Sequence, residues 1–194
     1  MGACSWPKGN PLMVRYHDKE WGKPVKNDRK IFEFLILESA QAGLSWLTIL
    51  KKRKGYRQAF ANFESLLVAR FGAQDVATLI KNPNIIRNRL KIEATINNAK
   101  RFLEVQKEFG TFSKYMWSFV GGRPIDGKRQ SLKDLPAITK ESKLLADDLK
   151  KRGFKFLGPT VVYAHMQAVG MVNDHIQTCF RYKELKMVEF GRNG

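Results

Sequence analysis

The fold of this 194-residue chain depends on a short stretch between two helix-forming segments, Lys151-Arg152-Gly153-Phe154-Lys155-Phe156-Leu157-Gly158-Pro159-Thr160. Apolar residues after it, from Val161 to Val169, recur at helical spacing. Gly158 can adopt a left-handed or closely approached backbone, and Pro159 suits the first position of a helix because its missing N–H costs nothing there. We therefore predict a helix, a short hairpin at residues 153–160, and a second helix.

The start of the second helix is a candidate phosphate site. Free backbone amides and the helix dipole favour an anion at a helix N-terminus. The upstream basic residues would add positive charge. Lys155, Gly158 and Thr160 are the candidate contacts. An ordinary helix connection with a solvated basic flank explains these residues equally well, so the sequence alone leaves both readings open.

The rest of the chain is also expected to be helical. Asn27-Asp28 can cap a helix that runs to about Ala42, and Ser45 can cap another from Trp46 to about Ala61. Further helices are expected near 64–71, 74–81, 88–108, 112–119 and 141–151, whereas 121–134 has the composition of a polar loop. This pattern predicts an all-α fold in which residues 1–194 form a single unit.

Composition points to a folded protein with a polyanionic partner. The chain has 35 Lys and Arg against 18 Asp and Glu, a formal net charge of +17, which is more than solubility requires. A nucleic-acid binder fits best, an anionic membrane surface is the second alternative, and a merely basic protein is the third. No apolar run approaches the ~18 residues of a membrane span and the first twenty residues lack a signal-peptide core, so we expect a cytoplasmic protein without membrane contact.

The 153–160 stretch resembles the hairpin of the helix-hairpin-helix DNA glycosylases, whose pattern is Leu-Pro-Gly-Val-Gly followed by a helix. Phe156 stands where the first glycine would fall, and Leu157-Gly158 keep the rest. Many members carry a catalytic aspartate in a Val-Asp-x-His stretch after that helix. The comparable stretch here is Val172-Asn173-Asp174-His175, with Asn173 at the aspartate position. This departure argues against aspartate-assisted chemistry and points to one branch of the superfamily.

That branch is the 3-methyladenine DNA glycosylase I family, which the chain resembles over nearly its whole length. Five separated blocks carry the resemblance: Tyr16-His17-Asp18-x-Glu20-Trp21-Gly22, Leu37-Glu38-x-x-Gln41-Ala42-Gly43-Leu44-Ser45-Trp46, Trp117-Ser118-Phe119-Val120, Lys151 to Gly158, and Val172 to His175. The resemblance implies a monofunctional base excision repair enzyme that flips 3-methyladenine out of double-stranded alkylated DNA. It would release the base by hydrolysis and leave an abasic site, without lyase activity. We expect it to act as a monomer.

Two cysteines and two histidines form a candidate metal set. His175 and Cys179 are four residues apart, so on a helix both would project from one face, and Cys4 and His17 could complete a tetrahedral site. Buried cysteines beside satisfied histidines are the alternative. The family resemblance implies one structural zinc ion on these four positions, which would tie the N-terminal segment, residues 1–26, to the C-terminal region. His165 has no comparable partner and is expected on a helix surface or in the core.

Glu38 is the candidate base-recognition residue. It lies in an apolar helix face, a poor place for a carboxylate unless it faces a polar cavity or finds a partner. The resemblance favours a purine pocket in which Glu38 and Tyr16 are catalytic and the aromatic residues Trp46, Trp6 and Trp21 bind the base. The alternative is that the tryptophans are core residues and that Glu38 pairs with a Lys or Arg.

The turn Gln41-Ala42-Gly43-Leu44-Ser45 is a candidate DNA contact. Leu44 could wedge into the space left by a flipped nucleotide, or it could belong to the core of a plain interhelical turn. Two rival functions remain at this stage. A DNA-binding module without catalysis would need neither Glu38 nor the aromatic residues, and a glycosylase-lyase would need a nucleophilic lysine beside the pocket. Residues 183–194 carry no motif.

Overall fold

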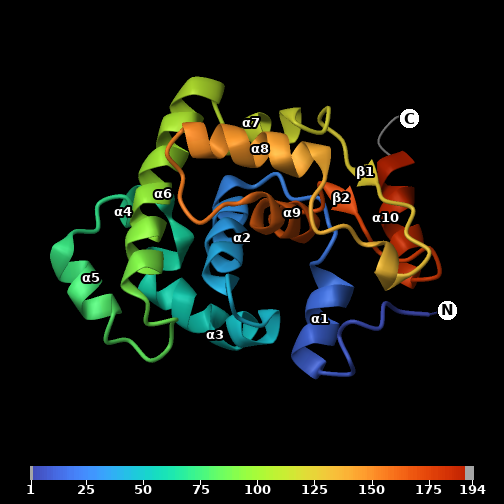
Figure 1. Ribbon diagram of the computed structural model, residues 1–194, viewed down its shortest axis with the longest axis horizontal. Helices are drawn as coiled ribbons and strands as arrows, with labels where there is room; N and C mark the ends of the chain where they lie inside the picture. Colours follow the sequence, from blue (N-terminus) through green and yellow to red (C-terminus); the bar gives the residue numbers. More distant parts are fainter. Residues whose placement is uncertain (1, 191–194) are drawn as a thin grey trace.

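A computed structural model describes the backbone of residues 2–190 and side chains as far as residue 186. As predicted, the fold is mostly helical (Figure 1). The helices are α1 (Pro11–Lys19), α2 (Asp28–Gln41), α3 (Trp46–Ala59), α4 (Ser65–Val68), α5 (Ala73–Leu79), α6 (Arg89–Phe109), α7 (Phe112–Ser118), α8 (Lys140–Lys151), α9 (Pro159–Ala168) and α10 (Phe180–Phe190), with short 3-10 turns at Ala61–Phe63 and Leu132–Asp134. Residues 191–194 of the motif-free tail lie outside the described residues.

Helix α2 is the centre of the core. Every residue from Ile31 to Ala40 is buried, because α3, α6, α7 and α9 pack around it. Its start is capped as expected, with the Asn27 side chain accepting from the Lys30 N–H, and Ser45 caps α3 by accepting from the Thr48 N–H. Helix α2 therefore carries two glutamates, Glu33 and Glu38, through the interior of the molecule.

The region expected to be a polar loop contains a short strand and the 3-10 turn Leu132–Asp134, neither of which the sequence indicated. Strand β1 (Ile125–Asp126) pairs in parallel with β2 (Val172–Asn173), in a register that sets Ile125 opposite Val172. A two-residue parallel pair between distant segments has no local pattern, since its partner strand comes from elsewhere in the chain. The correction is small, because the all-α character holds around this single short sheet.

The hairpin between α8 and α9 forms where it was predicted, but its backbone differs from the expectation. Gly158 is extended, with φ −68° and ψ 166°, and does not adopt the left-handed conformation. Phe156 does, with φ 58°, at the position where the superfamily pattern has its first glycine. Phe154 and Leu157 are buried beneath the turn, and they hold the backbone in a conformation that a non-glycine residue rarely adopts.

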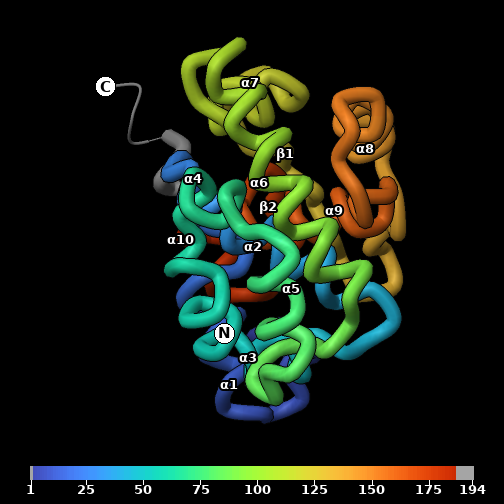
Figure 2. The backbone as a smooth tube through the Cα atoms, turned by 90° about the vertical axis from the view of Figure 1, so that its left-hand side faces the viewer, coloured from blue at the N-terminus to red at the C-terminus, as the bar shows by residue number. Residues whose placement is uncertain are grey.

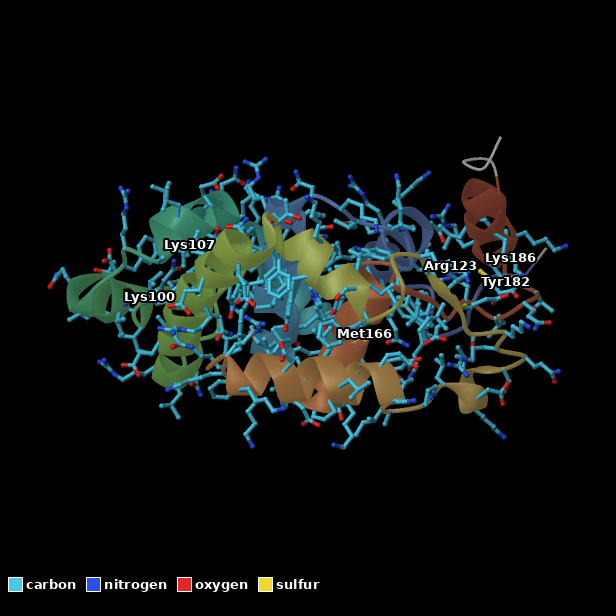
Figure 3. The ribbon with its side chains drawn as sticks, turned by 90° about the horizontal axis from the view of Figure 1, so that it is seen from above. Lys100, Lys107, Arg123, Met166, Tyr182 and Lys186 are labelled. Atoms are coloured by element: carbon cyan, nitrogen blue, oxygen red, sulfur yellow. The ribbon has the colours of Figure 1, made fainter. Side chains whose placement is uncertain are left out.

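The N-terminal segment and α10 lie on one side of the molecule, and α4, α5 and α6 lie on the opposite side, which faces the viewer in Figure 2 (Figures 1 and 2). Gly2 forms an isolated parallel bridge with Cys179. On the same side, Asp126 of β1 accepts a hydrogen bond from Tyr182 and pairs with Lys186 at 2.9 Å, both from α10 (Figure 3). In the part of the chain that is described, no helix combines the length and apolar character needed to cross a bilayer.

Candidate functional site

Glu38 is buried without a counter-ion. Its residue is 5% exposed, and no lysine, arginine or hydrogen-bond donor among the described side chains neutralises it. Burial alone raises the pKa of Glu38 to about 8. The alternative in which Glu38 pairs with a Lys or Arg is therefore wrong for the described residues. A carboxyl group held in this way is ready to meet a cation that enters from outside.

Aromatic side chains from α1, α3 and the N-terminal segment gather around Tyr16. The Tyr16 ring lies 5.2 Å from the Trp46 ring and 6.3 Å from the Trp6 ring, centre to centre. Trp21 packs against Trp6 at 5.2 Å and against His175 at 4.6 Å. The structure therefore brings Tyr16, Trp46 and Trp6 together, whereas Trp21 connects this group to the cysteine and histidine cluster.

The electrostatics of Tyr16 link it to Glu38. Burial raises the pKa of Tyr16 well above its usual value, and the nearby negative charge of Glu38 raises it further. The indole N–H groups of Trp46 and Trp6 are buried and have no hydrogen-bond partner in the described structure. Buried polar atoms without partners are uncommon and often mark functional sites. This region can thus supply aromatic faces, unused donors and one carboxyl group.

Arg53 holds the neighbouring structure in place, and nothing in the sequence identified it. It donates two hydrogen bonds to Glu20, at 2.8 and 2.7 Å, and a third to Glu33 at 2.8 Å. The Glu20 N–H in turn donates to the carbonyl of Tyr16. Arg53 therefore ties the end of α1, which carries Tyr16, to α2 and α3.

Cys4, His17, His175 and Cys179 form a buried cluster whose candidate ligand atoms all lie within 4.8 Å of one another. His17 Nε2 lies 3.2 Å from His175 Nδ1, and the cysteine sulfurs lie 3.6 to 3.7 Å from the imidazole nitrogens. Tetrahedral zinc with bonds of ~2.0–2.3 Å requires separations of about 3.3 to 3.8 Å between ligand atoms. The cluster can hold a metal ion, and its spacing suits zinc.

The outer nitrogens of both histidines have partners. His17 Nδ1 lies 2.6 Å from an oxygen of Asp18, and His175 Nε2 lies 3.0 Å from the carbonyl of Trp21. Such contacts orient metal-binding imidazoles. Gly22 leaves room for His175, because a Cβ at Gly22, whose φ is +78°, would lie 3.0 Å from His175 Nε2. The expected helix through His175 and Cys179 is wrong, since both lie in a turn before α10.

The segment from Val172 to His175, compared above with a Val-Asp-x-His pattern, is part of a structural network. Asn173 is buried and pairs weakly with the Tyr182 carbonyl at 3.4 Å. Asp174 is buried and accepts hydrogen bonds from Arg129, Tyr163 and Gln167. Because these partners use both of its oxygens, Asp174 is not a substitute for the missing aspartate. His165 is a fully buried core residue, one of the two positions expected for it.

The predicted DNA contacts lie at the surface. Leu44 is 40% exposed, which argues against the core alternative, and Gln41 and Gly43 flank it in the same turn, where Gly43 has a φ of +79°. Lys155, Gly158 and Thr160 are exposed on the hairpin. Arg152 contributes less free charge than its sequence suggests, because it forms ion pairs with Glu108 and Asp148.

Comparison with known proteins identifies the family that this chain matches. The family described as methyladenine glycosylase matches residues 6–182. The chain is 44% identical to DNA-3-methyladenine glycosylase 1 of Escherichia coli over 94% of this chain and 97% of that protein. A crystal structure of 3-methyladenine DNA glycosylase I is 47% identical, with a TM-score of 0.90, and covers 92% of this chain and 98% of that one. A structure addressing 3-methyladenine recognition by the Staphylococcus aureus enzyme is 40% identical, with a TM-score of 0.90 and 93% and 96% coverage.

Proposed function

The chain belongs to the methyladenine glycosylase family of DNA repair enzymes, and we propose that it flips 3-methyladenine out of double-stranded DNA and releases it by hydrolysis. The observation that carries the proposal is the buried carboxyl group of Glu38, which has no counter-ion among the described side chains and acts electrostatically on Tyr16, against whose ring Trp46 packs. A neutral purine offers such a group no compensating charge, whereas a 3-methylated adenine in DNA is a cation. The pocket therefore favours the damaged base.

The chemistry follows from the charge on the substrate. Entry of the cationic base would shift Glu38 to its carboxylate form, which can accept hydrogen bonds from the exocyclic amine. The face of Trp46 would stack on the cationic ring, and Tyr16 would contribute its hydroxyl. Water then bonds to the sugar carbon while the glycosidic bond breaks, and the proton that this water loses passes to the solvent. The electron pair of the broken bond neutralises the leaving base, so a strong general acid is unnecessary, and the lack of an aspartate at Asn173 is accounted for.

A monofunctional reaction needs no covalent enzyme intermediate. The contacts described for Glu38, Tyr16, Trp46 and Trp6, which would form the base pocket, include no lysine. The proposed products are the free base and an abasic site, with the strand left intact. The enzyme would act on DNA as a single unit over residues 1–194 and as a monomer, in the cytoplasm.

We further propose that Cys4, His17, His175 and Cys179 hold one structural zinc ion. Four protein ligands would leave no open position for catalytic water. When bound, the ion would lock the N-terminal segment, residues 1–26, against the turn before α10, because no disulfide connects these segments. Trp6 and Trp21 pack directly on His17 and His175, so the ion would also hold the pocket wall. Its role would be structural.

Two surface elements would hold the DNA. Leu44 is proposed to insert into the space that the flipped nucleotide leaves, with Gln41 and Gly43 beside it. The α8–α9 hairpin would bind the phosphate backbone through Lys155 and the backbone at Gly158 and Thr160, at the start of α9. The helix-hairpin-helix assignment of this region rests on the resemblance of its sequence and on the observed turn.

Chromatography of the material released from methylated duplex DNA tests the main proposal. We expect free 3-methyladenine and abasic sites that break only after alkaline treatment. Borohydride should trap no protein–DNA adduct. Release of no base would leave a DNA-binding module, and a trapped adduct would replace hydrolysis by a lyase mechanism.

The zinc proposal has its own test. We expect one equivalent of zinc in the purified protein, and Cys179→Ala should lower both metal content and melting temperature. The matched control is Ser39→Ala, which alters a buried polar residue in the core away from the cluster. Protein that is free of metal yet as stable as the zinc-loaded form would contradict the proposal.

A further inference from the structure

Lys91 of α6 holds the turn that carries Leu44. Its ammonium group donates to the carbonyls of Ala40 and Ala42, at 2.8 and 2.6 Å. These are carbonyls at the end of α2, and α2 has no basic residue in its own last turn. A cation at a helix C-terminus stabilises the exposed carbonyls and fixes where the chain leaves the helix. The Gln41–Ser45 turn is therefore tied to a residue more than forty positions away in sequence.

Asn98, on the same helix, holds the hairpin. It is fully buried, and its side-chain amide both accepts from the Lys155 N–H, at 2.8 Å, and donates to the Lys155 carbonyl, at 2.9 Å. The adjacent Asn97 donates to the Gly153 carbonyl at 2.9 Å. These bonds satisfy the backbone on the side of the turn just before Phe156, whose left-handed conformation needs support from its surroundings.

Lys91 and Asn98 lie seven residues apart on α6, so they share one face of the helix about 10 Å apart along its axis. We propose that they are positioning residues, and that α6 fixes the distance between the Leu44 turn and the phosphate-binding hairpin. This inference rests on the proposed function of both elements. The Leu44 turn and the phosphate-binding hairpin must contact one duplex at the same time. A rigid connection between them therefore determines where on the DNA a base is extruded.

The two contacts should have separable effects. Lys91→Met removes the cation and keeps the apolar stem, so the wedge turn loses its anchor. Single-turnover excision from duplex DNA should fall about tenfold, because extrusion depends on the wedge. Excision from the same sequence as a single strand should change less than about twofold, since no stacked duplex has to be opened. Lys107→Met, an exposed lysine on the same helix (Figure 3), is the control and should leave both rates unchanged.

Asn98→Leu should act on binding instead. Affinity for damaged and undamaged duplex should weaken equally, by about tenfold, while the ratio of duplex to single-strand excision at saturating enzyme stays the same. Asn98→Asp keeps the acceptor for the Lys155 N–H and loses the donor, so it should fall between the wild type and Asn98→Leu. If Asn98→Leu lowers the melting temperature, the ordered loss of DNA affinity from the wild type through Asn98→Asp to Asn98→Leu still decides whether Asn98 positions the hairpin.

Leu44→Ala separates this inference from the proposed function. A lower duplex-to-single-strand ratio in both Leu44→Ala and Lys91→Met supports both ideas. A lower ratio in Leu44→Ala alone overturns the positioning role of Lys91 and keeps the wedge. No change in Leu44→Ala overturns the wedge itself. Equal loss on both substrates in Lys91→Met would make Lys91 a stability residue and overturn the inference.

Discussion

Glu33 and Glu38 lie on the same helix, and both are almost completely buried, with 4% and 5% of each residue exposed. Glu33 accepts hydrogen bonds from Lys30, Arg53 and Arg57, and Arg53 and Lys30 hold its pKa at about 2 against the effect of burial. Glu38 has no such partner among the described side chains, and burial raises its pKa to about 8. With equal burial, Glu33 is thus ionised and Glu38 is mostly neutral at neutral pH, because cationic partners stabilise the charge of Glu33.

The difference separates a structural carboxylate from a functional one. Glu33 joins α2 to α3 and, through Arg53, to the end of α1. An apolar side chain of the same volume would stabilise the fold at least as well as Glu38, because burial of an acid without a partner lowers the free energy of unfolding. A buried acid that destabilises the empty protein is expected where a ligand supplies the missing charge.

The largest effect should come from breaking the Glu33 network. Glu33→Gln leaves Arg53 and Lys30 beside a neutral amide, and removal of a buried ion-pair partner costs about 2–4 kcal/mol in unfolding free energy. Glu38→Gln, measured alongside by urea denaturation, should change stability by less than about 1 kcal/mol or increase it. Equal losses in the two variants would contradict the comparison.

The next effect concerns activity, for which we expect Glu38 to matter more than Glu33. Glu38→Gln removes the charge that favours a cationic base and turns an amide donor toward the base's own donor. Single-turnover excision of 3-methyladenine should fall by about 1–3 kcal/mol of transition-state stabilisation, the scale of a buried charged hydrogen bond.

Affinity of the same variant for undamaged duplex should stay constant, which keeps the loss within the pocket. Glu33→Gln, assayed below its melting transition, serves as the matched control and should keep most of its excision rate. A wild-type rate in Glu38→Gln would make this carboxyl group structural and would move base recognition to Tyr16 and Trp46.

The sequence predicted most of the helices, because their signals are local, although α1 and α10 were not among those expected. Apolar spacing and the caps at Asn27 and Ser45 place α2 and α3 to within two residues at each end. The cysteine and histidine set was also identified correctly as a cluster, although through a helix that the structure does not contain. These features depend on residue type and short spacing, which a sequence displays directly.

What the sequence could not predict depends on partners from distant segments. The only local difference is Lys30, one helical turn before Glu33, because Arg53, which pairs with both Glu20 and Glu33, meets Glu33 only in the folded chain. By residue type, Gly158 was expected to have either a left-handed backbone or a close backbone approach, and it has neither. The positive φ angles of the hairpin lie at Gly153 and at Phe156, and the buried side chains of Phe154 and Leu157 flank Phe156.

The pH dependence of stability should have opposite signs at the two residues. The pKa of Glu38 is raised in the fold, so its contribution is largest below the ordinary pKa of 4.5 and is lost as the pH rises toward 8. The pKa of Glu33 is lowered, so its contribution is present above 4.5 and is lost as the pH falls toward 2. Each slope is at most about 1.4 kcal/mol per pH unit.

Urea denaturation of the two Gln variants against wild type, between pH 3 and pH 8, measures these slopes. The stability of Glu38→Gln relative to wild type should rise between pH 5 and pH 8, and the deficit of Glu33→Gln should shrink below pH 4.5. In activity, kcat/KM of the wild type should rise to about pH 8 as free Glu38 ionises, and Glu38→Gln should lack this rise. Parallel slopes in the two variants would mean that both residues have similar charge states.

The smallest effect should come from the exposed partner of Glu33. Arg57 and Arg53 donate to the same carboxylate oxygen, at 3.1 and 2.8 Å, but the Arg57 side chain is 50% exposed and that of Arg53 is 14% exposed. Water screens an exposed pair, so Arg57→Gln should cost no more than about 0.5 kcal/mol, and less at high salt. Arg53→Gln should cost several times more, because it removes the more buried of the two cations, Arg53 and Lys30, that pair with both Glu20 and Glu33. Urea denaturation at low and high salt compares the two. If Arg57→Gln and Arg53→Gln lost equal stability, the charge state of Glu33 would depend on the number of cations around it. The burial of Arg53 would then no longer explain why Glu33 is structural while Glu38 is free to bind a ligand.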